Sequence, residues 1–424
     1  MKKSTKIRFI VFEILIDLFK SSKHFDELFE KKIKQYKLNN KEKSFIFNVC
    51  LNTMRYSLHS KIILSSYVKK KLKISQYILL ASAITQIIFL NIKPYAVVNE
   101  TVEVSKKIKL YSSFINGVLN NVANDIKNLK QNTIIKKENL PIWFQDEIKK
   151  NKNINLKIFL DSYFFEPSLH IVFKSKKYVN KFNEEYDITS EKSLFIKSQK
   201  KVNEISNFKN GHWWIQNFSS MIPLALAENL ENKSILDLCA APGGKAFQVL
   251  SENKNIILND KSKNRIKMLK ENLSRLNYSA KIKNFDALSF PNNKKYDVII
   301  LDAPCSAIGT LRTNPEILFR RKNPDLKILS EKQTKLIEKA SSLLNSNGMI
   351  IYMVCSFFFS ETIEPFKKFL EKNKNFSVLG YNYKSNKMKI DKFISKEGYF
   401  LTAPTIYNNH RIDGFFSIQL IKND

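Results

Sequence analysis

The sequence predicts a protein of two parts, an all-helical N-terminal domain followed by an α/β domain built on a doubly wound parallel sheet. The chain has 424 residues, which is more than one ordinary domain contains. From residue 4 to about 130 apolar residues recur at helical spacing, and from residue 234 short apolar strands alternate with helical segments. We therefore expect a helical domain over 1–130, a linker and small α+β segment over 131–230, and an α/β domain over 231–424.

The first helical pattern places six apolar residues on one face, as an amphipathic helix requires. Pro94 separates two of the helices that follow, and the polar stretch 128–140, rich in Lys and Asn, is the expected linker. The apolar face of the first helix consists of Ile7, Ile10, Val11, Ile14, Leu15 and Leu18, and the further helical patterns cover 40–56, 75–91, 96–109 and 114–127.

Beyond the linker, the periodicity changes to that of strands. Leu169, Ile171 and Phe173 recur at every second position, which predicts a strand in the small middle segment. Two late strands, over 398–403 and 414–421, are expected as an antiparallel addition at the edge of the main sheet. The strands of the main sheet are expected at Ser234–Leu238, Ile256–Asn259, Lys281–Lys283, Tyr296–Leu301 and Met349–Val354, with helices over 245–251, 264–276 and 327–344.

The composition of the chain indicates nucleic acid as a partner and the cytoplasm as its compartment. The chain carries 71 Lys and Arg against 39 Asp and Glu, a net charge of +32, so nucleic acid is the first candidate partner. Part of this excess follows from a composition rich in Lys, Asn and Ile throughout. The four cysteines form no Cys-X-X-Cys pair, which argues against a disulfide framework or a zinc site and fits the reducing cytoplasm.

Neither apolar stretch near the N-terminus has the features of a membrane or export segment. The first is interrupted by Arg8, Glu13 and Asp17 and lacks a small-residue cleavage site, so it is not a signal peptide. The run from Tyr77 to Ile92 is short and contains polar residues, which favours a buried helix over a membrane span. We expect no membrane partner.

A glycine-containing loop follows the first strand of the α/β domain. Small residues and two glycines let the backbone approach a ligand at the carboxyl end of a strand, although a Gly-Gly pair alone also fits a tight turn. Asp260 ends the second strand about 20 residues later, where a carboxylate can bind ribose hydroxyls. Asp286 and Asp302 follow the third and fourth strands, and no GxxxxGK[ST] loop is present, so a nucleoside ligand is favoured over a triphosphate. The loop consists of Cys239, Ala240, Ala241, Pro242, Gly243, Gly244 and Lys245.

Two cysteines follow the fourth and fifth strands directly. Cys305 lies in Asp302-Ala303-Pro304-Cys305, and Cys355 follows Val354. A single cysteine is usually a small core residue, and this remains the interpretation for Cys50 and Cys239. If the fourth and fifth strands are neighbours, however, Cys305 and Cys355 meet at the carboxyl edge of the sheet, where ligands bind.

A pair of thiols suits the methylation of cytosine at carbon 5. That carbon is a poor nucleophile, and addition of a thiolate at carbon 6 converts the ring to an enamine that can attack a methyl sulfonium. The carbon-5 proton must then leave and the thiol must be expelled. One cysteine makes the bond, a second group helps to break it, and Asp302 can hold the activated ring by a hydrogen bond.

These residues resemble the motifs of the Sun/NOL1/NOP2 family of RNA cytosine-C5 methyltransferases, over nearly the whole chain. The matching motifs are Leu236 to Lys245, Asp302 to Gly309 and Cys355-Ser356. Pro94 to Val102 and Phe114 to Leu119 resemble the NusB-like RNA-binding domain fused to the bacterial RsmB branch, and Asp413-Gly414-Phe415-Phe416 is similar to that family's final strand.

The resemblance implies a Rossmann-like class I methyltransferase domain, S-adenosylmethionine as cofactor and 16S ribosomal RNA as substrate. It also implies that Cys355 is the nucleophile, that Cys305 assists product release, and that Asp302 acts beside them. The implied cofactor-binding residues are the 239–245 loop (Cys239, Ala240, Ala241, Pro242, Gly243, Gly244, Lys245), Asp260, Asp286 and Asp302. We expect a cytoplasmic monomer that holds no metal and acts on the RNA before the subunit is fully assembled.

Four positions depart from the family pattern, none of them a thiol or an acid named above. They are Asn217 after Gln216, where Asp is usual; Val354 in place of Thr before the nucleophile; Thr313 in place of the second Arg after Arg312; and Thr362 in place of Asn after Glu361.

Two other functions share part of the pattern. A DNA cytosine-C5 methyltransferase uses the same chemistry with one obligatory cysteine, in the Pro-Cys motif, and would make Cys305 the nucleophile. A non-catalytic RNA-binding or ribosome-assembly factor would rest on the helical domain and would need neither thiol. For the RNA methyltransferase, and equally for the RNA-binding factor, the candidate phosphate contacts are Lys69-Lys70-Lys71, Lys106-Lys107 and Arg320-Arg321-Lys322.

Overall fold

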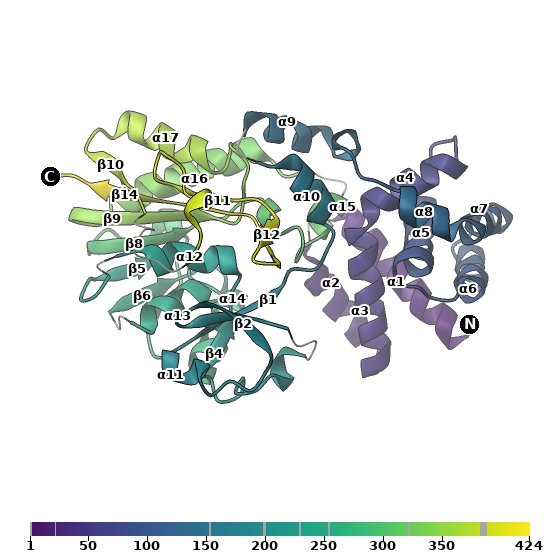
Figure 1. Cartoon of the computed structure of the whole chain (residues 1–424), viewed down its shortest axis with the longest axis horizontal. Coiled ribbons are helices and arrows are strands. Elements are labelled where there is room, and N and C mark those ends of the chain that lie inside the picture. The colour runs from purple at the N-terminus through teal and green to yellow at the C-terminus, as the bar shows by residue number, and fades with distance from the viewer. Residues whose placement is uncertain are drawn as a thin grey trace. The chain divides into compact units, whose positions relative to one another are not determined.

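The computed structural model describes residues 2–21, 23–151, 154–197, 201–228, 230–252, 255–320, 323–381 and 388–424 (Figure 1). Its contacts divide the chain into two compact units. The N-terminal unit comprises Met1–Asp146 with Tyr163–Phe165 and Leu311–Pro324, and the C-terminal unit comprises Glu147–Ser162, Glu166–Thr310 and Asp325–Asp424. Arg321 and Lys322, two of the candidate phosphate contacts, lie outside the described residues.

The N-terminal unit is helical, as predicted. Ile10, Val11, Ile14, Leu15 and Leu18 on its first helix are fully buried in one apolar core, because their spacing places them on one face. The helices are α1 (Lys3–Lys20), α2 (Phe25–Tyr36), α3 (Asn40–Arg55), α4 (Ser57–Tyr67), α5 (Ile74–Ile84), α6 (Pro94–Lys107), α7 (Ser112–Asn124), α8 (Ile126–Asn132) and α15 (Glu316–Phe319), with the π-helical turn η1 (Thr85–Phe89) and the 3-10 turn η2 (Lys137–Asn139).

Two features of this unit differ from the sequence prediction. Helix α8 occupies the first part of the expected linker, because Leu129 within that polar stretch is buried. The segment Leu311–Pro324, which follows the fourth strand of the main sheet, belongs to the N-terminal unit by its contacts. Phe319 joins the helical core, where its ring centroid lies 5.7 Å from that of Phe19, and the Arg55 guanidinium donates to the Arg312 carbonyl at 3.1 Å.

The large sheet of the C-terminal unit has the order β10-β14-β9-β8-β5-β6-β7, with β11 also paired to β14 (Figure 1). Strands β5 to β9 are parallel to their neighbours within the series β7-β6-β5-β8-β9, which confirms the predicted doubly wound sheet. The strands are β5 (Ile235–Asp237), β6 (Ile256–Asn259), β7 (Lys281–Lys283), β8 (Tyr296–Asp302), β9 (Leu344–Val354), β10 (Phe376–Leu379), β11 (Phe400–Thr402) and β14 (Phe415–Lys422).

The late strands are antiparallel, as predicted, but β14 is not at the edge of the sheet. It pairs with β9 on one side and with β10 on the other. Strand β10 was not predicted from the sequence, because it has only four residues and leaves Ser377 and Leu379 exposed. The predicted helix 327–344 also ends earlier, at Ser341, because β9 begins at Leu344.

The remaining elements surround the large sheet or form smaller ones. The predicted strand at Leu169–Phe173 is β1, in a small antiparallel sheet of order β2-β3-β1-β4. None of the helices in the described ranges combines the length and apolar character that a membrane span needs. The other elements are α9 (Ile142–Lys150), α10 (Leu156–Ser162), α11 (Lys176–Val179), α12 (Phe218–Leu226), α13 (Gly244–Leu250), α14 (Lys263–Arg275), α16 (Leu326–Ser341), α17 (Ile363–Lys372), β2 (Tyr186–Ser190), β3 (Ser193–Ile196), β4 (Trp213–Ile215), β12 (Thr405–Tyr407), β13 (His410–Ile412) and the 3-10 turns η3 (Val202–Glu204), η4 (Ala287–Ser289), η5 (Ile308–Thr310) and η6 (Asp391–Phe393).

Candidate active site

The predicted site residues follow the carboxyl ends of neighbouring parallel strands. In the register of the sheet, Asp237 at the end of β5 pairs with Ile300 of β8, and Asp302 at the end of β8 pairs with Met353 of β9. The loops after β5, β6, β8 and β9 therefore leave the sheet at the same edge, where open α/β sheets bind their ligands.

The glycine loop after β5 is fixed to the end of β6. Ala240 donates its N–H to the Asn259 carbonyl at 2.8 Å, and Ala241 donates its N–H to Asp260 Oδ2 at 3.3 Å. Gly243 has a φ of +117°, and a Cβ there would lie 2.2 Å from the ring of Phe247. The loop can therefore present backbone to a ligand only with glycine at this position.

The end of β6 contains a polar residue that the sequence analysis missed. The Asn259 amide is fully buried, donates to the Leu238 carbonyl at 3.0 Å and to the Phe285 carbonyl at 3.1 Å, and accepts from the Phe285 N–H. It thus joins the ends of β5, β6 and β7. The detectable signal was a polar side chain at the end of an apolar strand, immediately before Asp260.

Asp237 is a second residue that the site prediction omitted. Its carboxyl is buried, and burial followed by the nearby charge of Asp302 raises its pKa to about 7, while Lys245 acts in the opposite direction. Oδ1 accepts the Cys239 N–H at 3.3 Å. Within the part of the chain that the structure describes, Oδ2 is buried without a hydrogen-bond donor, so a positively charged ligand group would satisfy it.

The acids Asp302 and Asp286 lie in different surroundings. Asp302 Oδ2 lies 2.7 Å from Lys245 Nζ, so this ion pair joins the glycine loop to the loop that carries Cys305. The Lys245 ammonium also lies 5.0 Å from the centroid of the Phe415 ring. Asp286 is exposed, and its side chain accepts the Leu288 N–H at the start of η4.

The structure brings the two strand-end thiols together, as predicted. Cys305 Sγ and Cys355 Sγ are 3.2 Å apart, and β8 and β9 are adjacent parallel strands. The hydrogen bond with Cys355 and then burial raise the pKa of the Cys305 thiol well above its usual value. Cys50 lies in the helical core, as expected of a small apolar residue, and Cys239 is partly buried in the glycine loop.

Close backbone contacts hold the two cysteine loops against each other and against the start of β14. Gly309 donates its N–H to the Cys355 carbonyl at 3.0 Å, and Gly414 donates its N–H to the Gly309 carbonyl at 2.8 Å. A Cβ on Gly309 would lie 2.1 Å from the Gly414 carbonyl oxygen. The two thiols thus sit on loops that pack backbone to backbone.

Comparison with known proteins finds two matching families. Residues 223–421 match the family model described as 16S rRNA methyltransferase RsmB/F, and residues 5–124 match the NusB family. Residues 223–421 therefore form a methyltransferase domain of the RsmB/F type. Ribosomal RNA small subunit methyltransferase B of Shewanella oneidensis is 25% identical over 90% of this chain and 91% of that protein, and its counterpart in Serratia proteamaculans is 26% identical over 80% and 84%.

Solved structures share the fold of this chain. The crystal structure of PH0851 superposes with a TM-score of 0.71 at 19% identity, covering 100% of this chain and 99% of that one. A methyltransferase homolog protein from Pyrococcus horikoshii has a TM-score of 0.54 at 22% identity, covering 66% and 94%. The chain is an enzyme of the RNA methyltransferase class, with a helical domain ahead of its methyltransferase domain.

The departures from the RsmB/F pattern are accommodated locally. Asn217 caps α12, and its amide donates to Asp413 Oδ2 at 3.0 Å, a bond that an ionised aspartate could not donate. Val354 is fully buried as the last residue of β9, and the Thr362 hydroxyl donates to the Phe358 carbonyl at 2.7 Å. Thr313 is exposed.

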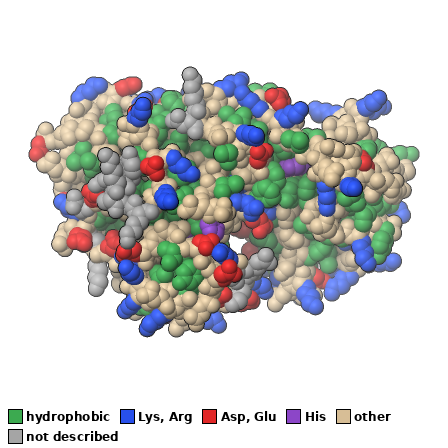
Figure 2. Space-filling view, viewed as in Figure 1, with side chains coloured by type: hydrophobic (Ala, Val, Ile, Leu, Met, Phe, Trp, Pro, Cys, Tyr) green, Lys and Arg blue, Asp and Glu red, His purple; other side chains and the backbone are tan. Residues whose placement is uncertain are grey.

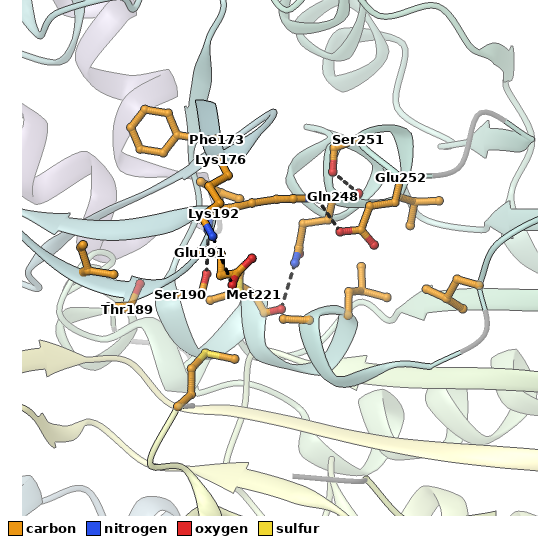
Figure 3. A pocket seen from close by; sticks show the side chains of 17 residues that line it. Phe173, Lys176, Thr189, Ser190, Glu191, Lys192, Met221, Gln248, Ser251 and Glu252 are labelled. Atoms are coloured by element: carbon orange, nitrogen blue, oxygen red, sulfur yellow. Dashed lines mark hydrogen bonds and ion pairs between the residues drawn. The ribbon is translucent and has the colours of Figure 1, made fainter. Parts of the chain in front are cut away.

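The C-terminal unit also contains a cavity of about 730 Å³ (Figure 3). None of the predicted site residues lines it, and its charged side chains pair with each other: Lys192 Nζ lies 2.9 Å from Glu252 Oε1, and Lys176 Nζ lies 3.5 Å from Glu191 Oε1. We therefore assign the chemistry to the sheet edge. In the described ranges, no group of three or more His, Cys, Asp or Glu side chains is placed to hold a metal ion.

Proposed function

We propose that this chain methylates carbon 5 of a cytosine in 16S ribosomal RNA through a covalent bond between the base and a cysteine. The observation that carries the proposal is the pair of thiols 3.2 Å apart, at the sheet edge that also carries the glycine loop. The match to the 16S rRNA methyltransferase RsmB/F model and the names of the relatives support the ribosomal RNA substrate.

The residues of the sheet edge fit S-adenosylmethionine. The Gly243 backbone allows close approach, the Asp260 carboxylate lies beside the loop, and the buried Asp237 Oδ2 suits the ammonium of an amino acid. We infer that the 239–245 loop, Asp237, Asp260, Asp286 and Asp302 hold the cofactor. When bound, it supplies the methyl group as a sulfonium.

The two thiols have different tasks in the proposed reaction. The Cys355 thiolate adds to carbon 6 of the cytosine, which makes carbon 5 nucleophilic. After methylation the carbon-5 proton passes to solvent, the electron pair of the C–H bond re-forms the double bond between carbons 5 and 6, and Cys355 leaves as a thiolate. The hydrogen bond to Cys355 favours the protonated form of Cys305. The resemblance of the Cys355-Ser356 and Asp302 to Gly309 motifs to those of the family supports Cys355 as the attacking sulfur and Cys305 as the group that assists its expulsion.

Asp302 and Lys245 complete the proposed site. Their ion pair, at 2.7 Å, connects the loop that binds the cofactor with the loop that carries Cys305. An Asp302 carboxyl held in this way can hydrogen-bond the cytosine ring where the base carries the charge of the adduct.

The form of the RNA substrate can be inferred from the reaction, because the thiol must reach a single base. A thiol can attack carbon 6 only when the cytosine has left its stack, and this is easiest before the RNA is covered by proteins. We infer that the protein acts in the cytoplasm, as a monomer and without metal, on 16S RNA that is not yet fully assembled.

Methylation by the purified protein tests the function. Radiolabelled S-adenosylmethionine is supplied with protein-free 16S RNA, intact small subunits, 23S RNA or duplex DNA, and labelled positions are mapped by bisulfite sequencing. We expect a single cytosine in protein-free 16S RNA to be labelled. Preferential labelling of DNA would favour the DNA methyltransferase, and RNA binding without any labelling would favour the assembly factor.

A further inference from the structure

The two cysteine loops share a dipeptide, and both of its serines bind one carboxylate. Ser306 follows Cys305, and Ser356 follows Cys355. Glu361, which lies between β9 and α17, accepts the Ser306 hydroxyl at 2.5 Å and the Ser356 hydroxyl at 2.7 Å, both on Oε2. A single side chain therefore connects the residues next to both thiols.

The other oxygen of Glu361 is also occupied. Oε1 accepts the Ser306 N–H at 2.6 Å and the Gln333 amide at 3.5 Å, and that amide also donates to the Pro304 carbonyl at 3.1 Å. Burial raises the pKa of Glu361, and hydrogen bonds from Ser306 and Ser356 act in the opposite direction. Because both oxygens already accept two donors each, the carboxylate is suited to holding the loops rather than to taking a proton from the substrate.

Glu361 is itself fixed to the strand that carries Cys355. The hydroxyl of Tyr352, a fully buried residue of β9, donates to the Glu361 carbonyl at 2.7 Å. The Glu361 N–H donates to the Phe358 carbonyl at 3.1 Å. The carboxylate is thus anchored by β9 and extends from there to the loop that follows β8.

We propose that Glu361 is a positioning residue that sets the separation of Cys305 Sγ and Cys355 Sγ, an inference that rests on the proposed two-thiol reaction. Both sulfurs must act on one cytosine ring, so both loops must keep their places together. A displacement of about 1 Å in a reacting group can cost about 100-fold in rate. Without Glu361, the serine hydroxyls and the Ser306 N–H lose their common acceptor, and the two loops are no longer joined through it.

The variants that test this role are Glu361→Ala and Glu361→Gln, with Glu147→Gln as a matched control. Glu147 is also a buried carboxylate, and it binds a serine of the segment between β9 and α17 that contains Glu361. It accepts the Ser360 N–H at 3.3 Å and the Ser360 hydroxyl at 2.8 Å. It holds neither cysteine dipeptide. Loss of stability is therefore common to all three variants, and loss of thiol alignment is expected only of the two at Glu361.

The first measurement needs neither RNA nor cofactor. Diamide oxidises the two thiols to a disulfide, with both protons and both electrons passing to its N=N bond, and mass spectrometry follows the Cys305–Cys355 product. We expect Glu361→Ala to slow this oxidation about tenfold or more, Glu361→Gln to slow it less, and Glu147→Gln to leave it within about twofold. A folded Glu361→Ala protein that forms the disulfide at the wild-type rate would overturn the proposal.

The second measurement is methylation of 16S RNA. We expect kcat of Glu361→Gln to fall about tenfold or more while KM for RNA stays within about threefold, because alignment and not binding is lost. If Glu361→Ala does not fold, Ser306→Ala and Ser356→Ala each remove one hydroxyl donor, and an unchanged oxidation rate in both would overturn the proposal. A wild-type protein that methylates no RNA, while the variants still slow the disulfide, would refute the proposed function and leave the positioning role standing.

Discussion

The carboxyl edge of the large sheet and the surface of the N-terminal unit use polar side chains in opposite ways. At the sheet edge, charged and sulfur groups are held at short fixed distances, as in the pair of Asp302 with Lys245 and the pair of thiols. On the N-terminal unit, Lys69, Lys70 and Lys71 are exposed between α4 and α5. Substitutions at the first region should change rates and cofactor affinity, whereas substitutions at the second should change RNA affinity and its dependence on salt.

The largest effect should come from the thiols, and the two should fail differently. Cys355→Ala removes the attacking atom, so we expect methylation and any covalent RNA adduct to disappear. Cys305→Ala leaves attack and methyl transfer possible but impairs elimination, so the protein should accumulate as a covalent complex with methylated RNA. The complex is measured as a retarded band on a denaturing gel.

Cys50→Ala is the control for this pair, because Cys50 is a buried core thiol far from either loop in the sequence. It should lose about 1 kcal/mol of stability and trap no RNA. If Cys355→Ala traps RNA in a covalent complex and Cys305→Ala does not, the roles of the two cysteines are reversed, as the DNA-type mechanism predicts. Full activity in both variants would refute the two-thiol reaction.

The next largest effect should be on cofactor affinity. Asp260→Ala removes a carboxylate that accepts the Ala241 N–H and the Ser262 N–H, so it loosens the glycine loop and removes the expected ribose contact. We expect calorimetry to show S-adenosylmethionine affinity reduced about tenfold or more, since hydrogen bonds to charged groups contribute about 1.5–3 kcal/mol. Asp297→Ala is the control: Asp297 binds Ser234 at the opposite end of β5 and should affect stability alone.

Much of this edge could be predicted from the sequence because it depends on local patterns. Each parallel strand is a short apolar run, and its last residues mark the edge of the sheet, so the meeting of Cys305 and Cys355 followed from strand order alone. The role of Glu361 could not be predicted, because it depends on how the chain after β9 folds back on the loop after β8. The packing of Phe319 with the N-terminal helices is equally non-local, and no periodicity within so short a segment indicates it.

A smaller effect is expected on the pH dependence of cofactor binding. The pKa of Asp237 is raised to about 7, so part of the free protein carries a proton there near neutral pH. Binding of an ammonium favours the ionised form, and the proton is released. We therefore expect affinity to rise with pH and to be about tenfold weaker at pH 6 than at pH 8, as one pKa near 7 requires.

The Asp237→Asn variant shows whether the pH dependence of cofactor binding arises from Asp237 or from another titrating group. It should bind the cofactor more weakly than wild type at pH 8, and its affinity should vary little between pH 6 and 8. The same raised pKa means that the free energy of unfolding of the cofactor-free protein falls as pH rises from about 4 to 7, because the folded state holds the extra proton. A wild-type affinity that does not change with pH would move the ammonium contact to another residue.

The smallest effects should arise from single basic clusters, because the positive charge is widely distributed. Figure 2 shows Lys and Arg side chains spread over the visible face, with Asp and Glu between them. Some candidate cations also have structural contacts: Arg320 donates to the Lys23 carbonyl at 2.7 Å, Lys106 pairs with Glu103 at 2.7 Å, and the Lys107 ammonium lies 3.8 Å from the centroid of the Phe9 ring.

Replacing Lys69, Lys70 and Lys71 with Gln should therefore reduce RNA affinity modestly and make it less sensitive to salt. Neutralising one lysine that binds a phosphate lowers the slope of log K against log[salt] by about 0.7–0.9, so neutralising three would lower it by about 2 to 3. The control replaces three lysines of α17 that pair with Glu397, Glu364 and Glu338, namely Lys367, Lys368 and Lys372. The two triple variants have the same net charge, so an equal slope in both would show that overall charge, and not the exposed cluster on the N-terminal unit, binds the phosphates. A wild-type affinity independent of salt would exclude phosphate binding as its source.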